Sequence, residues 1–212
     1  MLVACRQRYA LYFKNKKFSF AVVAAALLLA ASLVVNYYAV LYAEERASNP
    51  VTDIVLSNTR VYDVDGTFVY GSFLLWTFVC LLCLYKPQRI PFTFKSVALF
   101  TLIRSLFISL THIGPYPTHA IIQSNILAQF SFGADLFFSG HTGLPFLLAL
   151  IFWQDKALRT LFLVAAVIFA IVVLLGHLHY SIDVLAAFFI TYSICHIAER
   201  LFVSDRNFFY DA

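Results

Sequence analysis

Charged side chains are scarce in this chain of 212 residues, since Asp, Glu, Lys and Arg make up only 12% of it. Soluble domains are about 25% charged and about half apolar, whereas this chain is 62% hydrophobic. Its 23 Phe and 12 Tyr residues add apolar surface that a soluble protein of this size could not bury. The scarcity of charge therefore excludes a soluble domain and indicates a membrane protein.

Cysteines and clustered carboxylates are also few, which argues against two further classes of protein. None of the four cysteines, Cys5, Cys80, Cys83 and Cys195, lies in a segment expected outside the membrane, so a disulfide framework is not expected. Cys80 and Cys83 have CxxC spacing without a second pair, and we interpret them as ordinary helix residues. No carboxylate cluster suits Mg²⁺, and the basic residues do not form one face as in nucleic-acid-binding proteins. We expect no metal, no cofactor and no nucleic-acid partner.

Six apolar segments alternate with short polar gaps along the chain. They are Phe18–Tyr42, Phe68–Tyr85, Phe94–Ile113, Leu136–Trp153, Leu158–Leu175 and Tyr180–Ile197. Each is long enough, at about 1.5 Å per helical residue, to cross a hydrocarbon core of about 30 Å. The chain contains no internal repeat and no low-complexity linker. The sequence therefore predicts an all-α, polytopic membrane protein, with residues 1–212 forming a single bundle of six transmembrane helices.

Lys and Arg residues are distributed unequally between the two predicted sides of the membrane. Five precede the first apolar segment, three lie in residues 86–95, two in residues 154–159 and two in the carboxyl-terminal tail. The opposite side has two, Arg46 and Arg60. Because basic loops stay in the cytoplasm, twelve against two predicts that both termini are cytoplasmic. The remaining basic residue, Arg104, lies within the third apolar segment.

Two polar clusters interrupt the apolar background, at residues 133–142 and at residues 176–183. The predicted topology puts both at the outer membrane surface, where they would form one composite active site. His179 and Asp183 are four residues apart and are expected on one helix face, where the carboxylate can accept the imidazole N–H and leave the other nitrogen nucleophilic. In a soluble helix this pair would more simply be a capping His and a surface Asp. Its position at the membrane boundary, beside a second polar cluster, favours a functional role.

The other polar residues near these clusters suit a phosphate group. His141 is a second imidazole that can protonate a departing alkoxide. Ser139 offers a hydroxyl and Gly140 an accessible backbone N–H, and the amino termini of the fourth and sixth segments favour phosphate at the same surface. Arg104 is near the middle of its helix, so we expect it to face the protein interior and to bind phosphate.

These motifs resemble the membrane lipid phosphate phosphatase superfamily, in which two His and one Asp form the catalytic set. The resemblance is closer to its sphingomyelin synthase branch, and the matching residues are Asp135-x3-Ser139-Gly140-His141-Thr142 and His177-x-His179-Tyr180-x2-Asp183. The run from Arg104 through Thr111 to Pro115 and Pro117 resembles the third-helix motif of that branch. The similarity covers about residues 95–200, the expected catalytic core. It implies that His141, His179 and Asp183 are catalytic and that Arg104, Asp135, Ser139, Gly140 and Tyr180 bind the substrate.

The resemblance implies a phosphotransferase that moves a phosphocholine- or phosphoethanolamine-type headgroup from a phospholipid to a lipid alcohol, through a phosphohistidine intermediate. The acceptor would be ceramide or diacylglycerol. The active site is expected on the extracytoplasmic side of a bacterial inner membrane, or of the Golgi or plasma membrane in a eukaryote. A lipid phosphatase or phospholipase C with the same His/His/Asp site stays open, as does a non-catalytic lipid-binding or transport protein. A homo-oligomer stays open as well.

The number of buried cations helps to choose between these activities. The phosphatase branch usually has a Lys-x6-Arg-Pro motif and a Ser-Arg pair before the second His, and neither is present, since Val173 stands where that Arg would fall. A phosphomonoester carries nearly two negative charges at neutral pH, and its burial calls for several cations. With Arg104 as the only buried cation, the sequence favours a singly charged phosphodiester.

Overall fold

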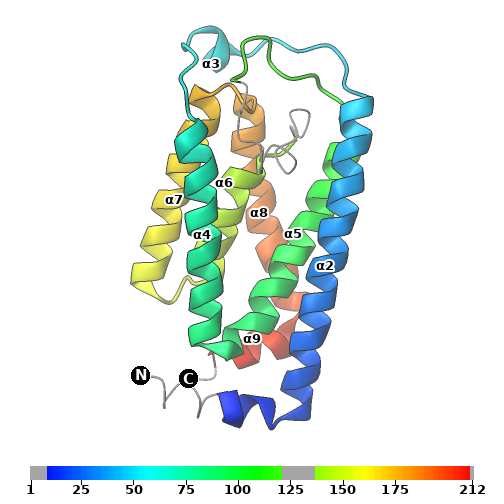
Figure 1. Cartoon of the computed structure of the whole chain (residues 1–212), viewed down its shortest axis with the longest axis vertical. Coiled ribbons are helices and arrows are strands. Elements are labelled where there is room, and N and C mark those ends of the chain that lie inside the picture. The colour runs from blue at the N-terminus through cyan, green and yellow to red at the C-terminus, as the bar shows by residue number, and fades with distance from the viewer. Residues whose placement is uncertain (1–8, 121–136, 211–212) are drawn as a thin grey trace.

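The computed structural model describes residues 9–120 and 137–210, and all regular structure in these two ranges is helical. The elements are α2 (Lys16–Glu45), α3 (Ile54–Ser57), α4 (Asp65–Tyr85), the 3₁₀ helix η1 (Pro87–Arg89), α5 (Ile90–Leu110), α6 (Gly140–Ile151), α7 (Lys156–Leu175), α8 (Ser181–Leu201) and α9 (Val203–Tyr210). The long helices run side by side along the length of the molecule, with α3 across one end and α9 at the other (Figure 1). The predicted all-helical class is confirmed.

Within the described ranges five helices, α2, α4, α5, α7 and α8, are long and apolar enough to cross a membrane. The expected sixth span, Leu136–Trp153, is not confirmed, because its helix α6 has 12 residues and is only about 18 Å long. Its first expected residue lies outside the described ranges. The late start of α6 has a local cause, since Ser139 is its N-cap and the Ser139 side chain accepts a hydrogen bond from the Thr142 N–H at 3.4 Å.

The third span also differs from the prediction, because α5 begins at Ile90 and ends at Leu110. Its early start suits Pro91, whose fixed φ and missing N–H are well tolerated in the first turn of a helix. At the other end, Thr111 has an extended backbone and stops the helix. The polar gap before this span is therefore shorter, and the polar gap after it longer, than hydropathy alone predicts.

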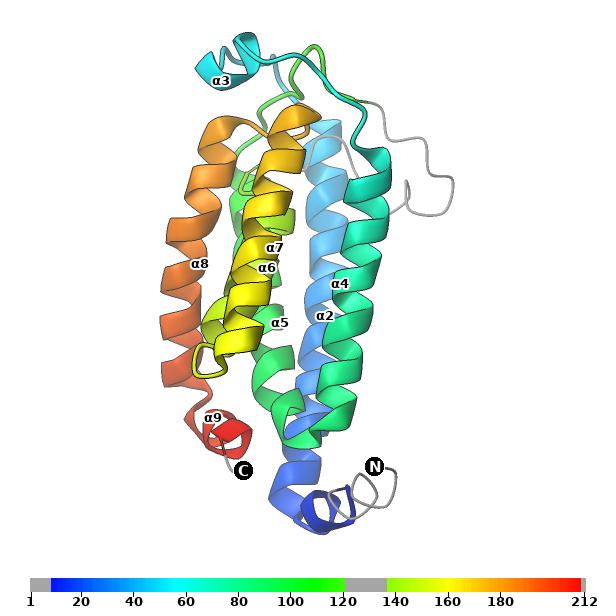
Figure 2. The ribbon, with the colours of Figure 1, turned by 90° about the vertical axis from the view of Figure 1, so that its left-hand side faces the viewer.

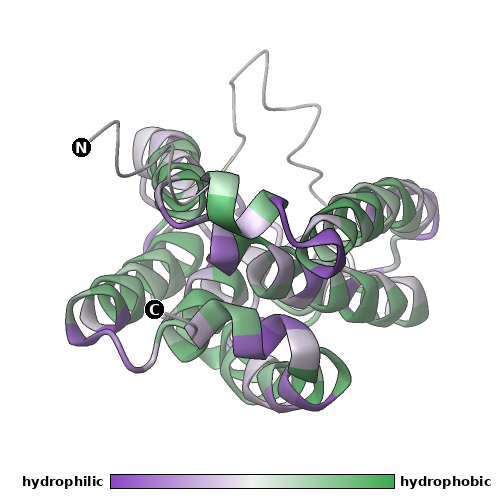
Figure 3. Ribbon diagram, turned by 90° about the horizontal axis from the view of Figure 1, so that it is seen from below, coloured by the Kyte–Doolittle hydropathy of each residue, from purple (hydrophilic) through white to green (hydrophobic). Residues whose placement is uncertain are grey.

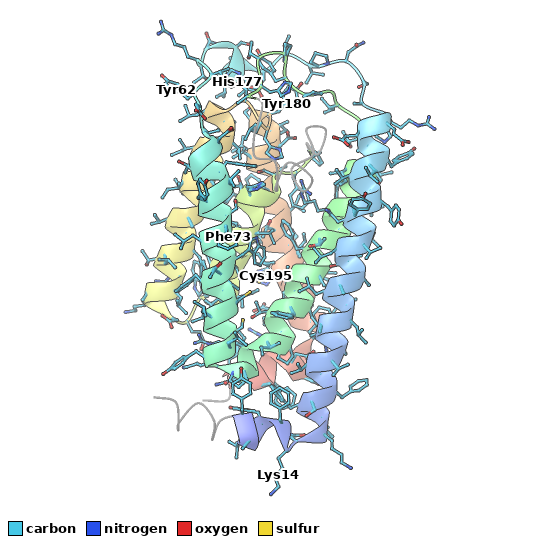
Figure 4. The ribbon with its side chains drawn as sticks, in the orientation of Figure 1. Lys14, Tyr62, Phe73, His177, Tyr180 and Cys195 are labelled. Atoms are coloured by element: carbon cyan, nitrogen blue, oxygen red, sulfur yellow. The ribbon has the colours of Figure 1, made fainter. Side chains whose placement is uncertain are left out.

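The two ends of the bundle carry different side chains. Lys14 lies at the end where α2 begins and α9 is found, whereas Tyr62, His177 and Tyr180 lie at the opposite end with α3 (Figures 1 and 4). A second view gives the same arrangement, with the start of α2 and the end of α9 at one end of the molecule (Figure 2). The basic segments and the histidine cluster are therefore separated along the bundle. Which end faces the cytoplasm stays a prediction.

Helix α6 is surrounded by α5, α7 and α8, which lie against it. The approach is close at Gly143, where an added Cβ would lie 2.8 Å from the Phe100 ring of α5 and 2.9 Å from Thr191 Oγ1 of α8. The outward faces of the long helices are mainly apolar (Figure 3), and large side chains such as Phe73 and Phe189 are exposed. An apolar exterior around a packed centre is the pattern that a lipid environment requires.

At the end that carries α3, residues 46–64 and 111–120 fold across the helix termini. The backbone N–H of Ser48 donates to the His112 carbonyl at 2.8 Å, and that of Tyr62 donates to the Leu175 carbonyl at 2.9 Å. A Cβ on Gly114 would clash with the Ser48 carbonyl oxygen, so only glycine allows these two loops to meet. The loops hold the amino terminus of α8 in place.

Candidate active site

His179 and Asp183 lie together at the amino terminus of α8, with His179 Nδ1 3.7 Å from Asp183 Oδ2. The prediction that they share a helix face is wrong, because α8 begins at Ser181 and His179 precedes it. The chain enters the helix through the extended residue Tyr180, and Asp183 Oδ2 accepts the Tyr180 N–H at 2.9 Å. A capping turn, and not helical periodicity, therefore brings the imidazole to the carboxylate.

The Asp183 side chain is fully buried and His179 is only 5% exposed. Among the described residues, Asp183 Oδ1 has no hydrogen-bond partner, while its other oxygen accepts the capping bond. The Ser139 N–H donates to the Asp183 carbonyl at 3.2 Å, which joins the two polar clusters directly. The structure thus brings together two motifs that are 40 residues apart in the sequence, as expected for a composite site.

Arg104 is buried in α5 and lies against the first turn of α6. Its Nε donates to the Phe138 carbonyl at 2.9 Å, and a Cβ added to Gly140 would lie 3.1 Å from the same nitrogen. The Arg104 side chain therefore faces the protein interior, as its position in the sequence indicated. Its guanidinium group and the amino terminus of α6 present positive charge at one point. A role in binding phosphate stays a prediction.

A cavity of about 200 Å³ lies beside this contact and is lined by Arg104, Gly140 and His141. The His141 ring packs against Phe68 of α4, with ring centroids 4.0 Å apart. Arg104 and His141 therefore border the same space from different helices. His179 itself does not line the cavity. Of the two expected catalytic imidazoles, His141 is therefore the one in contact with this space.

The residues that line the cavity and were not selected from the sequence include Asn36 of α2, and Ser72 and Trp76 of α4. Ser105 Oγ of α5 lies 3.4 Å from Asn36 Oδ1, so α2 and the helix of Arg104 meet through polar side chains beside the cavity. The sequence does contain an indication of this role, because the polar residues Asn36 and Ser72 interrupt long apolar runs. Ionisable or polar residues at such depth usually face a bundle interior.

Asp53 is another residue whose role could not be predicted from the sequence. It caps α3 by accepting the N–H groups of Val55 and Leu56, and its Oδ2 accepts the Ser181 N–H at 2.7 Å and the Ser181 hydroxyl at 2.8 Å. Burial by itself raises the pKa of Asp53, but the backbone hydrogen bonds from Leu56 and Ser181 outweigh it and hold this pKa below its usual value. No local pattern could reveal this contact, because Asp53 and Ser181 are 128 residues apart.

Tyr180, an expected substrate-binding residue, is only 1% exposed. Its hydroxyl donates to the Gly114 carbonyl at 2.8 Å and accepts the Val51 N–H at 3.2 Å, so it joins both outer loops to α8. These contacts give Tyr180 a structural role, and a contact with substrate stays a prediction. Asp135, another expected substrate-binding residue, lies outside the described residues.

His177 has a left-handed backbone conformation, with φ of 52°, in the turn after α7. Its Nδ1 forms a hydrogen bond of 2.8 Å with Thr118 Oγ1, and its ring packs edge-on against Tyr116. His177 and Tyr180 lie at the same end of the bundle (Figure 4). The His177 ring is therefore held by the outer loops, away from the cavity that His141 lines.

Within residues 9–120 and 137–210, no three His, Cys, Asp or Glu side chains are grouped so that they could hold a metal ion. In the same ranges Cys80, Cys83 and Cys195 are free thiols. The described part of the site therefore offers imidazole, carboxylate and guanidinium groups for chemistry.

Residues 133–200 match the family described as PAP2 superfamily C-terminal. This range contains both polar clusters and the whole expected catalytic set. Comparisons with curated proteins and with solved structures gave no match. The family match supports the phosphatidic acid phosphatase-like superfamily, and with the apolar helices it supports an integral membrane enzyme of the lipid phosphatase or phosphotransferase type.

Proposed function

We propose that this protein transfers a phosphorylated headgroup from a phospholipid to a lipid alcohol, in the manner of a sphingomyelin synthase. The observation that carries the proposal is the cavity shared by Arg104, Gly140 and His141. Among its described lining residues, Arg104 is the only Lys or Arg. A single cation in a low-dielectric site matches the single charge of a phosphodiester better than the nearly double charge of a phosphomonoester.

In the first step, the phosphorus of the phospholipid lies at the border of the cavity towards His179, and a nitrogen of His179 attacks it. The bond between phosphorus and the diacylglycerol oxygen breaks, and protonated His141 gives its proton to that oxygen. Asp183 stabilises the positive charge that develops on His179, which its position at 3.7 Å supports. The products are diacylglycerol and a phosphohistidine that carries the headgroup.

In the second step, the hydroxyl of an acceptor such as ceramide or diacylglycerol attacks the same phosphorus. Neutral His141 removes the hydroxyl proton as the bond between phosphorus and His179 breaks. The headgroup leaves on the acceptor, and both imidazoles return to their starting protonation states. No net charge or proton is left on the protein after the two steps.

Arg104 and the amino terminus of α6 would stabilise the phosphoryl oxygens throughout. The contact between Gly140 and the Arg104 side chain puts backbone N–H groups and a guanidinium group at one point. Helix amino termini favour anions because their first N–H groups are unpaired and the helix dipole is positive there. Such preorganised donors commonly supply the largest share of transition-state stabilisation.

Hydrolysis is the second candidate, since the family match supports phosphatases as well as phosphotransferases. The same phosphohistidine would then be attacked by water, which gives a phospholipase C or a lipid phosphatase. The two activities differ only in which acceptor reaches the intermediate. Bulky aromatic residues around His141, including Phe68 and Phe169, would help to exclude water and favour transfer.

The test is to give the purified protein, in liposomes, headgroup-labelled phosphatidylcholine or phosphatidylethanolamine with ceramide or diacylglycerol, and separately labelled phosphatidate. We expect label to move from the phospholipid to the acceptor lipid, with little phosphate released from phosphatidate. A His179→Ala protein serves as the inactive control. Rapid phosphate release from phosphatidate without transfer to any lipid alcohol would establish the phosphatase instead.

A further inference from the structure

An apolar groove of about 430 Å³ lies between α4 and α7. Its lining includes Gly71, Leu75 and Phe78 of α4, and Val164, Ile168 and Phe169 of α7. Its volume falls within the range of about 300–1,000 Å³ that is usual for small-molecule sites. Both helices are long and apolar enough to span a membrane, so the groove faces hydrocarbon and not water.

The groove adjoins the cavity of the candidate active site. Leu75 and Phe169 line both spaces, and the Phe169 ring centroid is 6.1 Å from that of His141. A Cβ on Gly71 would lie 3.3 Å from the Phe169 ring, so this position leaves little room between the two helices. A molecule in the groove would therefore touch the same ring that touches the expected catalytic acid.

The groove also has a direction. On α4 it extends from Thr67 to Phe78, which is roughly 16 Å at 1.5 Å per residue. Helix α4 begins at the end of the bundle that carries α3 and runs away from it (Figures 1 and 2). Phe78 therefore lies at the end of the groove that is farther from the polar clusters, and Phe169 lies nearer to them. The end near Phe169 thus lies next to the cavity of Arg104 and His141, while the end near Phe78 is surrounded by apolar side chains. A lipid has the same arrangement, with a charged headgroup at one end and hydrocarbon at the other.

We propose that this groove binds one acyl chain of the phospholipid donor while its phosphate occupies the cavity of Arg104 and His141. The inference rests on the proposed function and adds the route by which the substrate is held. Val164 and Ile168 are 51% and 47% exposed, so a chain can enter sideways from the bilayer without a movement of the backbone. Acyl-chain length then contributes to the KM of the donor.

The test uses two matched substitutions on α7. Val164 lines the groove and Val167 does not, although the two side chains are equally exposed, at 51% and 52%. With Val164→Trp, we expect the KM for a dipalmitoyl phospholipid to rise about tenfold and that for a dihexanoyl phospholipid to change less than about twofold. With Val167→Trp, both KM values should stay at the wild-type level. If the KM for the dipalmitoyl phospholipid divided by the KM for the dihexanoyl phospholipid is the same in both variants, the proposal is overturned.

A second measurement separates this proposal from the proposed function. A phospholipid with a photoactivatable diazirine near the end of one acyl chain is bound to the His179→Ala protein, and the crosslinked peptides are identified by mass spectrometry. We expect crosslinks around Phe78 and Leu161, and their loss when Val164→Trp is added. Crosslinks spread evenly over the exposed faces of the helices would refute the groove even if headgroup transfer is observed. Crosslinks in the groove would support it even in a protein without transferase activity.

Discussion

Asp53 and Ser181 are 128 residues apart in the sequence and are joined by two hydrogen bonds, of 2.7 and 2.8 Å. One carboxylate oxygen accepts both the backbone N–H and the hydroxyl of Ser181, the first residue of α8. The other oxygen caps α3. This contact fixes the turn that carries His179, although Asp53 does not touch the cavity. Asp53 is therefore a positioning residue.

We predict that Asp53→Asn destabilises the folded protein by about 1.5–3 kcal/mol, which is usual for the loss of a hydrogen bond to a charged group. The folded-state pKa of Asp53 is below its usual value, so its contribution is present above the unfolded-state pKa and is lost as the pH falls through the folded-state pKa. The Tm difference between the wild type and Asp53→Asn should be constant near neutral pH. It should shrink below about pH 4. A difference that stays the same down to pH 3 would contradict the prediction.

Gly140→Ala is expected to reduce turnover by about 10- to 100-fold, since small displacements of a positioned group cost this much. The new Cβ would lie 3.1 Å from Arg104 Nε and 3.3 Å from Cζ, so the guanidinium group must move. The matched control is Gly66→Ala, because a Cβ at Gly66 meets nothing within 4 Å. Headgroup transfer measured for both proteins checks the prediction, and equal activities would show that the contact with Arg104 is unimportant.

His141→Ala, His179→Ala and Asp183→Asn should each lower turnover at least about a thousandfold, and their effects should not add, because the three residues act as one unit. His196→Ala is the control, since this His is on the exposed side of α8 and pairs with Glu199. His177→Ala should do less harm than His179→Ala, because its ring is held by Thr118 and Tyr116. Size-exclusion profiles of the purified variants test whether folding is retained. A fully active His179→Ala protein would end the phosphohistidine mechanism.

The orientation in the membrane can be tested with single cysteines in a cysteine-free background. Asp63 and Gln154 are both exposed. Asp63 belongs to the loop between α3 and α4 and Gln154 to the loop between α6 and α7, and these two loops lie towards opposite ends of the bundle (Figure 1). We expect Asp63→Cys to react with an impermeant thiol reagent in intact cells and Gln154→Cys to react only after the membrane is permeabilised. The reverse pattern would invert the topology and put the candidate site on the cytoplasmic side.

Much of the site could be predicted because its residues come from two short motifs. Ser139, Gly140 and His141 are consecutive, and His179 is close to Asp183 in sequence, so proximity within each motif follows from chain connectivity. The two motifs meet through the hydrogen bond from the Ser139 N–H to the Asp183 carbonyl. The sequence predicted this meeting only because both motifs were expected at the same depth in the membrane. The pairing of His179 with Asp183 was expected for the wrong reason, since a helix cap produces it.

The sequence by itself determined the helical class and the approximate spans, because in a bilayer a run of apolar residues has to satisfy its own backbone hydrogen bonds. It also determined the position of Arg104 within a helix. Only the tertiary structure decided that Asn36 and Ser72 line the cavity, that Asp53 holds Ser181, and that Phe169 lies between the cavity and an apolar groove. These contacts depend on which faces of distant helices and loops meet, and hydropathy or spacing along the chain contains no information about that choice.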